Sequence, residues 1–106
     1  MNSPTQRTLK YFRNQGMVCE VVERWNPHSR TRHDLFNMFD IVCLDGGCIQ
    51  GIQATSSSNH ASRVKKLLNN ELLRLWIGSG GRALVVSWGK KRGRWAARVE
   101  PVTYGS

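Results

Sequence analysis

An acid, an amide and a hydroxyl lie at the ends of two short apolar runs near the middle of the chain. Asp40 is at the head of the first run, and Gln53 and Thr55 end the second. The Asp45-Gly46-Gly47 segment between the runs is typical of a β-hairpin, which we expect over residues 39–57. Because strand side chains alternate between faces, Asp40 and Gln53 are expected side by side, with Thr55 on the face of Gln53. A buried carboxylate needs a partner, and a hard cation would satisfy all three side chains.

Apolar spacing and chain-breaking residues predict the elements that position this hairpin. The expected order is helix, strand, hairpin, helix and two further strands, written αβββαββ. This order and the chain length predict one domain over residues 1–106, an α+β (α/β-like) sandwich with a mixed central sheet. The expected bounds are a helix from Pro4 to about Gln15, a strand at 17–25, the hairpin, a helix from His60 to Ile77, and strands at 82–88 and 94–102.

Capping residues mark the ends of both helices. Ser3 suits the N-cap of the first helix and Gly16 its left-handed stop, while Gly78 would end the second. The inward face of the second helix is predicted to consist of Val64, Leu67, Leu68, Leu72 and Leu75.

Three further side chains of the second helix are candidate site residues. His60 falls one turn above Val64, at the end that follows Gln53, so we expect it to face the site. Arg63 and Lys66 flank the apolar stripe, where they would either meet a phosphate or remain in solvent.

The chain carries a large excess of positive charge. Its 106 residues include 16 Lys and Arg against 7 Asp and Glu, which gives a formal net charge of +9 at pH 7. Polyanions are the expected partners of such a domain. Interleaving of the cations with Trp and Tyr favours nucleic acid over the alternatives, which are solubility alone and attraction to an acidic protein.

Two basic segments are the candidate nucleic-acid contacts. Arg30 and Arg32 lie in the polar segment 26–33, which we expect to be a substrate-facing loop or a merely solvated one. Lys90-Lys91-Arg92 lies in an expected turn at 89–93 that is bracketed by glycines. That turn would contact phosphates, or its charges would only protect a sheet edge from pairing.

Three cysteines lie in apolar runs, at Cys19, Cys43 and Cys48. Their odd number and expected burial predict reduced thiols in a cytoplasmic protein, and the Cys and His spacings match no zinc motif. No apolar run approaches the roughly 18 residues of a membrane span, and the first residues form no apolar signal segment. We therefore expect a soluble protein.

The arrangement around Asp40 resembles the PD-(D/E)xK nucleases, a superfamily that includes restriction enzymes, phage exonucleases and Holliday-junction resolvases. Those enzymes carry an acid at the head of one strand and a Glu-x-Lys or Gln-x-Lys motif on its antiparallel neighbour. Here Asp40 matches the first acid and Gln53 the second, while Thr55 occupies the position of the lysine. The segments 32–36 and 53–56, followed by Asn59, Arg63 and Lys66, look like small phage proteins related to such resolvases.

This resemblance implies a metal-dependent DNA endonuclease with a restriction-endonuclease-like core. Asp40, the side-chain oxygen of Gln53 and the carbonyl of Ala54 would hold Mg²⁺ or Mn²⁺, which would activate a water. In such nucleases an acid of the first helix or strand sometimes helps, and Glu20 is the candidate here; its alternative is an exposed or ion-paired strand residue. A cation from the second helix, Arg63 or Lys66, or His60 as proton acceptor, would replace the missing lysine.

Asp34 has three interpretations, which are an outer metal ligand, a partner of Arg30 or Arg32, and a cap for the turn at 35–38. We favour the last two.

The resemblance also implies partners and a place of action. Branched or duplex DNA would be the substrate, a homodimer would be the working unit, and the cytoplasm of an infected bacterial host the location. The alternative is a catalytically inactive nuclease-fold protein that binds nucleic acid or regulates a host protein.

Overall fold

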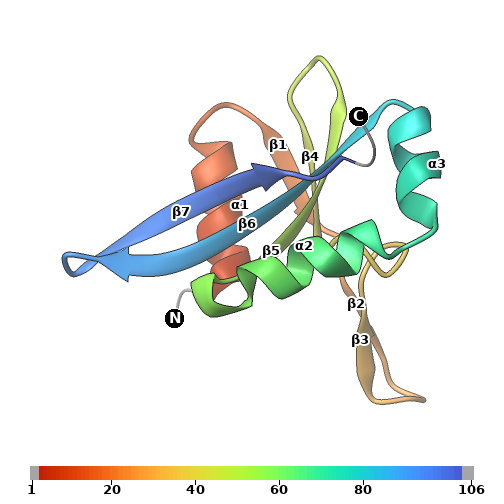
Figure 1. The fold of residues 1–106 in the computed structure, drawn as a ribbon, viewed down its shortest axis with the longest axis horizontal. Helices are drawn as coiled ribbons and strands as arrows, with labels where there is room; N and C mark the ends of the chain where they lie inside the picture. Colours follow the sequence, from red (N-terminus) through yellow and green to blue (C-terminus); the bar gives the residue numbers. More distant parts are fainter. Residues whose placement is uncertain (1–2, 104–106) are drawn as a thin grey trace.

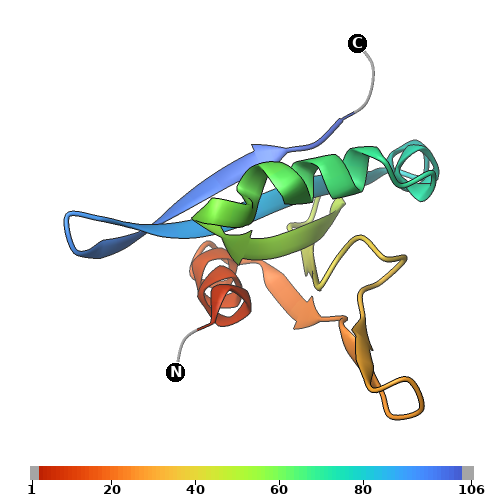
Figure 2. The ribbon, with the colours of Figure 1, turned by 60° about the horizontal axis from the view of Figure 1, so that its bottom comes forward.

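The chain folds around a five-stranded sheet with helices on both faces, as the computed structural model of residues 3–103 shows (Figures 1 and 2). Its elements in chain order are α1 (Pro4–Arg13), β1 (Val18–Val21), β2 (Arg24–Asn26), β3 (Thr31–His33), β4 (Ile41–Leu44), β5 (Ile49–Ser56), the 3-10 turn η1 (Ser57–Asn59), α2 (His60–Leu68), α3 (Leu72–Gly78), β6 (Gly81–Lys91) and β7 (Arg94–Pro101). The order across the sheet is β1-β4-β5-β6-β7; β5 and β6 run parallel, and the other neighbours are antiparallel. The predicted α+β class with a mixed sheet is confirmed.

Helix α1 covers one face of the sheet. Its predicted start is confirmed, because the Ser3 hydroxyl oxygen accepts a hydrogen bond from the Gln6 N–H at 3.2 Å. After α1 the chain turns through Gly16, whose φ of +89° is the left-handed conformation expected of a helix stop. The buried cluster on this face comprises Leu9, Phe12, Cys19, Ile41, Cys43, Ile52, Leu84, Val86 and Trp88.

Helices α2 and α3 cover the opposite face, and the prediction of one continuous helix there is wrong. The Asn70 side chain accepts a hydrogen bond from the Leu72 N–H at 2.8 Å and donates one to the Phe36 carbonyl at 3.0 Å. These side-chain bonds compete with helical ones and end α2. The predicted inward face is wrong in part, because Leu68, Leu72 and Leu75 are exposed. Leu67 is buried as predicted, and after the break Leu73 is buried instead. The cluster on this face comprises Met38, Phe39, Leu67, Leu73, Ala83, Val85 and Val102.

Strands β2 and β3 form a separate hairpin where a continued strand and a loop were predicted (Figure 1). The turn between them is stabilised by the Asn26 side chain, whose oxygen accepts a hydrogen bond from the His28 N–H at 2.9 Å. Where the chain leaves and rejoins the main sheet, the Val22 N–H donates to the Asp40 carbonyl at 2.9 Å. The hairpin is therefore an insert between β1 and β4 that is closed at its base.

The second basic segment lies at the tip of the β6–β7 hairpin. Lys90 and Lys91 continue β6 and pair with Trp95 and Arg94, so the turn is shorter than the predicted 89–93. It consists of Arg92 and Gly93, whose φ values of +52° and +78° are typical of tight two-residue hairpin turns.

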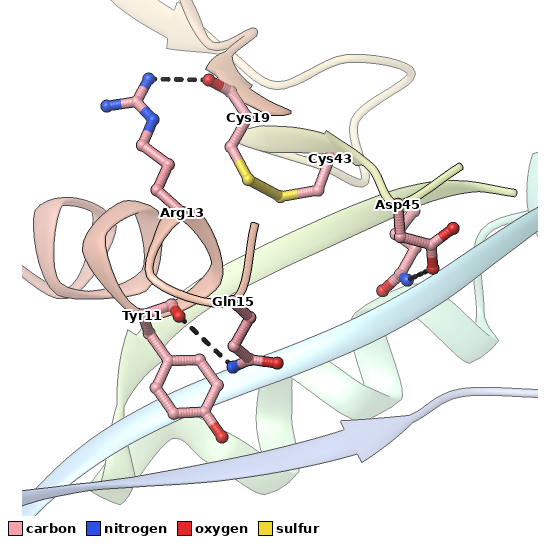
Figure 3. The surroundings of a disulfide bond; sticks show 7 residues. Tyr11, Arg13, Gln15, Cys19, Cys43 and Asp45 are labelled. Carbon is pink, nitrogen blue, oxygen red and sulfur yellow. Dashed lines mark hydrogen bonds between the residues drawn. A yellow bond between two sulfur atoms is a disulfide. The ribbon is translucent and has the colours of Figure 1, made fainter. Parts of the chain in front are cut away.

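Cys19 and Cys43 face each other across β1 and β4, and their sulfur atoms form a disulfide (Figure 3). The Arg13 guanidinium donates to the Cys19 carbonyl at 2.7 Å beside this bond. The prediction of three reduced thiols is thus wrong, because neither apolar run alone reveals the register of β1 against β4. The pairing also removes the argument by which reduced cysteines indicated the cytoplasm.

Gly51 lets the Phe39 ring lie directly on β5. A Cβ at this position would overlap the ring, which is fully buried. Gly51 pairs with Val42 in the β4–β5 ladder, so the contact lies just below the point where Asp40 enters the sheet. The glycine therefore helps fix the position of Asp40.

Replacement of Gly51 by Ala is expected to lower the free energy of unfolding by about 1–3 kcal/mol, because the added methyl group displaces the Phe39 ring. Chemical denaturation measures the change. Gly47→Ala is the matched control, since its Cβ would meet only the Asp45 carboxylate at an ordinary 3.4 Å. Equal stabilities of the two variants would contradict the packing described.

Alkylation of the denatured protein without reductant is expected to modify Cys48 alone, and all three cysteines after reduction. Intact mass gives the count. Because the bond joins residues separated by 24 positions, its reduction should lower the free energy of unfolding by about 3 kcal/mol. Three labelled thiols before reduction would show that Cys19 and Cys43 are not paired.

Candidate functional site

A polar cavity of about 530 Å³ opens where β5 continues beyond Ile52, past the start of β4. Its walls come from the start of α1, the base of the β2–β3 hairpin, the loop before β4, the second half of β5, and α2. The charged and polar residues in its lining include Glu23, Arg32, Asp34, Asp40, Gln53, Ala54, Thr55, Arg63 and Lys66.

Asp40 lies opposite Gln53, as the sequence predicted. Ile41 pairs with Ile52 in the antiparallel ladder, and the Asp40 N–H donates to the Ile52 carbonyl at 3.0 Å. The Asp40 residue is only 5% exposed, and Oδ1 of its carboxylate accepts a hydrogen bond from the Ala54 N–H at 3.2 Å. No side chain of residues 3–103 forms a hydrogen bond or ion pair with this carboxylate.

The surroundings of Asp40 disfavour its negative charge. Burial raises the pKa of Asp40 from 3.8 to about 7. The hydrogen bond from the Ala54 N–H opposes this shift, whereas the negative charges of Asp34 and Glu23 add to it. A cation bound beside the carboxylate would reverse the balance, because it would stabilise the ionised form.

Helix α2 brings two cations to Gln53. The Lys66 ammonium donates to Gln53 Oε1 and to Asp34 Oδ2, both at 3.2 Å. The Arg63 guanidinium donates to the same amide oxygen at 3.3 Å. Thr55 also lines the cavity, but its hydroxyl carries no charge. Positive charge therefore reaches the site from the helix instead of from β5.

Asp34 does not pair with Arg30 or Arg32, so that prediction is wrong. Its carboxylate accepts hydrogen bonds from Lys66 and from the Gln53 amide, the latter at 3.2 Å. The turn that follows is closed by the Asp34 backbone carbonyl, which accepts the Asn37 N–H at 3.1 Å; its side chain does not cap the turn. Sequence patterns could not show this pairing, because α2 lies far along the chain.

The oxygen donors of the cavity fit a hard divalent cation. Asp40 offers carboxylate oxygens that have no side-chain partner. The Gln53 amide oxygen and Asp34 Oδ2 now accept hydrogen bonds from Lys66, and they would exchange these bonds for the ion. Among residues 3–103 there is no group of three His, Cys, Asp or Glu side chains that could hold a metal ion. Mg²⁺ is nevertheless usually held by one or two carboxylates and completed by water. The donor set therefore fits an ion that keeps several waters.

Glu20, the predicted extra acid, lies outside the cavity, and Glu23 takes its place in the lining. Glu20 is an exposed residue of β1 that pairs with Val42. Because the chain turns after Val21, the alternation of one long strand does not extend to Glu23. Its carboxylate instead accepts a hydrogen bond from Arg32 at 3.0 Å. The signal that could have found Glu23 is its position three residues before the basic segment 26–33.

His60 also lies outside the cavity, on the side of α2 that packs against β6 and β7. Its Nδ1 lies 2.6 Å from the Ser87 hydroxyl and its Nε2 lies 2.8 Å from the Glu100 carboxylate. The imidazole is buried and both nitrogens have partners. The structure therefore assigns His60 to a polar network that fixes the start of α2.

The predicted nucleic-acid contacts separate into two groups. Arg32 lies in the cavity wall, and Arg30 lies at the turn of the β2–β3 hairpin with a φ of +53°. The segment 90–92 lies at the tip of the β6–β7 hairpin, at the opposite end of the molecule (Figures 1 and 2). Of these predicted contacts, only Arg32 shares the cavity lining with Asp40.

Without metal, the free energy of unfolding should depend on the protonation of Asp40. Its pKa is higher in the folded protein, about 7, than its ordinary 3.8, so the folded state binds the proton more tightly. This stabilising contribution is fully present below about pH 4 and is lost as pH rises to about 7. Asp40→Asn should therefore exceed wild type in stability at pH 8, by on the order of 2–4 kcal/mol, and converge with it near pH 4.

Denaturation across this pH range in the presence of a chelator measures the difference. Asp45→Asn is the control of opposite sign, because hydrogen bonds from the Cys48 and Gly47 N–H groups and from Gln50 lower the pKa of Asp45 to about 2. Parallel wild-type and Asp40→Asn profiles would contradict the buried, unpaired carboxylate.

Comparisons with known proteins assign no family to the chain. No family model, no curated protein and no solved structure matches it. Within residues 3–103, no helix is long and apolar enough to cross a membrane. The geometry and charges of the cavity are therefore the basis for a functional proposal.

Proposed function

We propose that the chain is a metal-dependent DNA endonuclease whose active site is the cavity around Asp40. The observation that carries this proposal is a buried carboxylate that faces a polar cavity without a partner side chain. An ionised carboxylate in this setting lowers the free energy of unfolding unless a cation binds beside it. Perturbed carboxylates of this kind cluster at functional sites.

The neighbours of Asp40 support hydrolysis of a phosphodiester. When bound, the divalent cation would supply Lewis-acid stabilisation of the phosphate and a more acidic water. Asp40, Asp34 and the Gln53 oxygen would hold it, with the Ala54 carbonyl as a further donor from the cavity wall.

Lys66 takes the role that the resembled family gives to the lysine of its motif. Its ammonium lies 3.2 Å from Gln53 Oε1, so it provides positive charge at the position of the second motif residue. Arg63, which contacts the same oxygen at 3.3 Å, would hold a phosphate oxygen. Thr55 contributes a hydroxyl to the cavity wall, and Arg32 extends the positive charge toward the β2–β3 hairpin.

The wider setting of the proposal follows the resemblance. The sheet, with α1 on one face and α2 after β5, would be a restriction-endonuclease-like core. A phage-encoded resolvase-like enzyme acting in the host cytoplasm as a homodimer would be the biological form.

Cleavage of branched, single-stranded and duplex DNA with Mg²⁺ or Mn²⁺ tests the proposal. Asp40→Asn should lower the cleavage rate on the order of 100-fold or more, because it removes the charged metal ligand. Lys66→Ala should lower it about 10- to 100-fold, with partial recovery in Lys66→Arg. Lys65→Ala is the matched control, since Lys65 is an exposed neighbour on α2 outside the cavity.

Two further results separate the proposal from a non-catalytic binding protein. Mn²⁺ should raise the melting temperature of wild type but not of Asp40→Asn. A wild-type protein that binds DNA, cuts none of the three forms and gains no stability from Mn²⁺ would instead establish the binding alternative.

A further inference from the structure

We infer that Trp25, on the β2–β3 hairpin, is a stacking platform for an unpaired base of the nucleic acid that enters the cavity. This inference rests on the proposed function of the cavity and adds a preference for substrates with unpaired nucleotides. It begins from an unusual exposure: Trp25 is 60% exposed although it belongs to a strand. Among residues 3–103 no ring or cation packs on its indole.

The strand pairing places Trp25 next to a residue of the cavity wall, although Trp25 itself is outside the lining. Trp25 pairs directly with Arg32 across β2 and β3. Directly paired residues of an antiparallel ladder project from the same face, with their Cβ atoms about 5 Å apart. Because Arg32 lines the cavity, the face that carries Trp25 continues the cavity wall onto the hairpin.

The charge of the hairpin suits a nucleic-acid strand. Residues 24–33 contain three arginines and two histidines and neither Asp nor Glu. Glu23, just before them, is neutralised by Arg32. A backbone that approaches the cavity along this hairpin would meet only neutral or positive side chains.

The hairpin also holds its shape without a partner. The Asn26 side chain accepts the His28 N–H at 2.9 Å, and the Ser29 hydroxyl lies 2.6 Å from the Thr31 hydroxyl. The whole arm projects beyond the main sheet, so it is open to an approaching ligand (Figures 1 and 2). An ordered arm loses little conformational entropy when a base stacks on it.

Trp95, the other strongly exposed tryptophan, differs from Trp25 because a cation covers one face of its ring. Trp95 is 47% exposed, but the Arg7 guanidinium lies 3.6 Å above its ring. One face of that ring is therefore occupied within the protein. Trp95 thus offers a matched control of similar size and exposure at a different place.

Stacking distinguishes unpaired from paired nucleotides. A base in a blunt duplex already stacks on its neighbours, whereas an unpaired base has a free face for an aromatic side chain. The platform should therefore add affinity for single strands and for duplexes with single-stranded flaps, and little for blunt duplexes. Since every base has such a face, the preference should be tolerant of sequence.

Fluorescence anisotropy in EDTA, at one fixed salt concentration, tests the inference. The probes are a short oligothymidylate, a duplex with a single-stranded flap and a blunt duplex. Trp25→Ala should weaken binding of the first two about tenfold or more and leave the third within about twofold. Trp25→Phe should retain most of the affinity, and Trp95→Ala should leave the ratio of single-strand to blunt-duplex affinity unchanged.

Trp25→Lys separates stacking from charge. It adds a cation but removes the ring, so it should weaken binding of the single strand while blunt-duplex binding stays equal or rises. Because Trp25 is exposed, these variants should keep the melting temperature of wild type. An equal loss on all probes, or no loss on any, would overturn the inference.

The outcomes also separate this inference from the proposed function. DNA cleavage by a wild-type protein whose Trp25 variants bind like wild type would overturn the stacking role alone. Selective loss of single-strand binding in a protein that cuts nothing would support the platform and overturn the endonuclease. A wild-type protein that binds none of the probes, and that cuts none of the DNA forms with Mg²⁺ or Mn²⁺, would overturn both.

Discussion

The register of β4 against β5 is the constraint on which the rest of the site depends. Ile41 pairs with Ile52, so Asp40 and Gln53 project together toward α2 while the two isoleucines project toward α1. A shift by one residue would move Asp40 into the apolar cluster under α1 and remove it from the cavity. The contact of the Phe39 ring with Gly51 opposes such a shift, because no other position in β5 lacks a side chain.

Burial of the Asp40 carboxylate lowers the free energy of unfolding, and apolar packing on both faces of the sheet offsets this loss. One apolar cluster lies between α1 and the sheet, and the other lies between the sheet and α2 with α3. Between them the sheet is rigid enough to hold a carboxylate whose ionisation burial disfavours. Proteins commonly retain unfavourable groups of this kind where function needs them, at some expense of stability. Lys66 and Asp34 form an ion pair nearby, although the negative charge of Asp34 still helps to raise the pKa of Asp40.

Local patterns were enough for the hairpin around Asp40 and for the start and stop of α1, because turn and capping chemistry act over a few residues. Features that depend on contacts between residues far apart in the chain could not be predicted from local patterns. Cys19 meets Cys43 only through the β1–β4 register, and Lys66 meets Asp34 only once α2 lies on the sheet. His60 shows the same limit. Its position on the helix predicted that it faces the site, which is wrong, because its partners Ser87 and Glu100 come from strands later in the chain.

The hydrogen bond from the Val22 N–H to the Asp40 carbonyl closes the β2–β3 insert at its base. The insert could therefore change in length while the main sheet stays the same. Its two ends meet at one point of the sheet, so longer or shorter arms would change the entropy of loop closure only slightly. Descendants of this chain would therefore diverge in the arm while the strands around Asp40 stay the same. Under the proposed function, substrate choice and chemistry would evolve on separate parts of the molecule, which meet at the backbone contact between Val22 and Asp40.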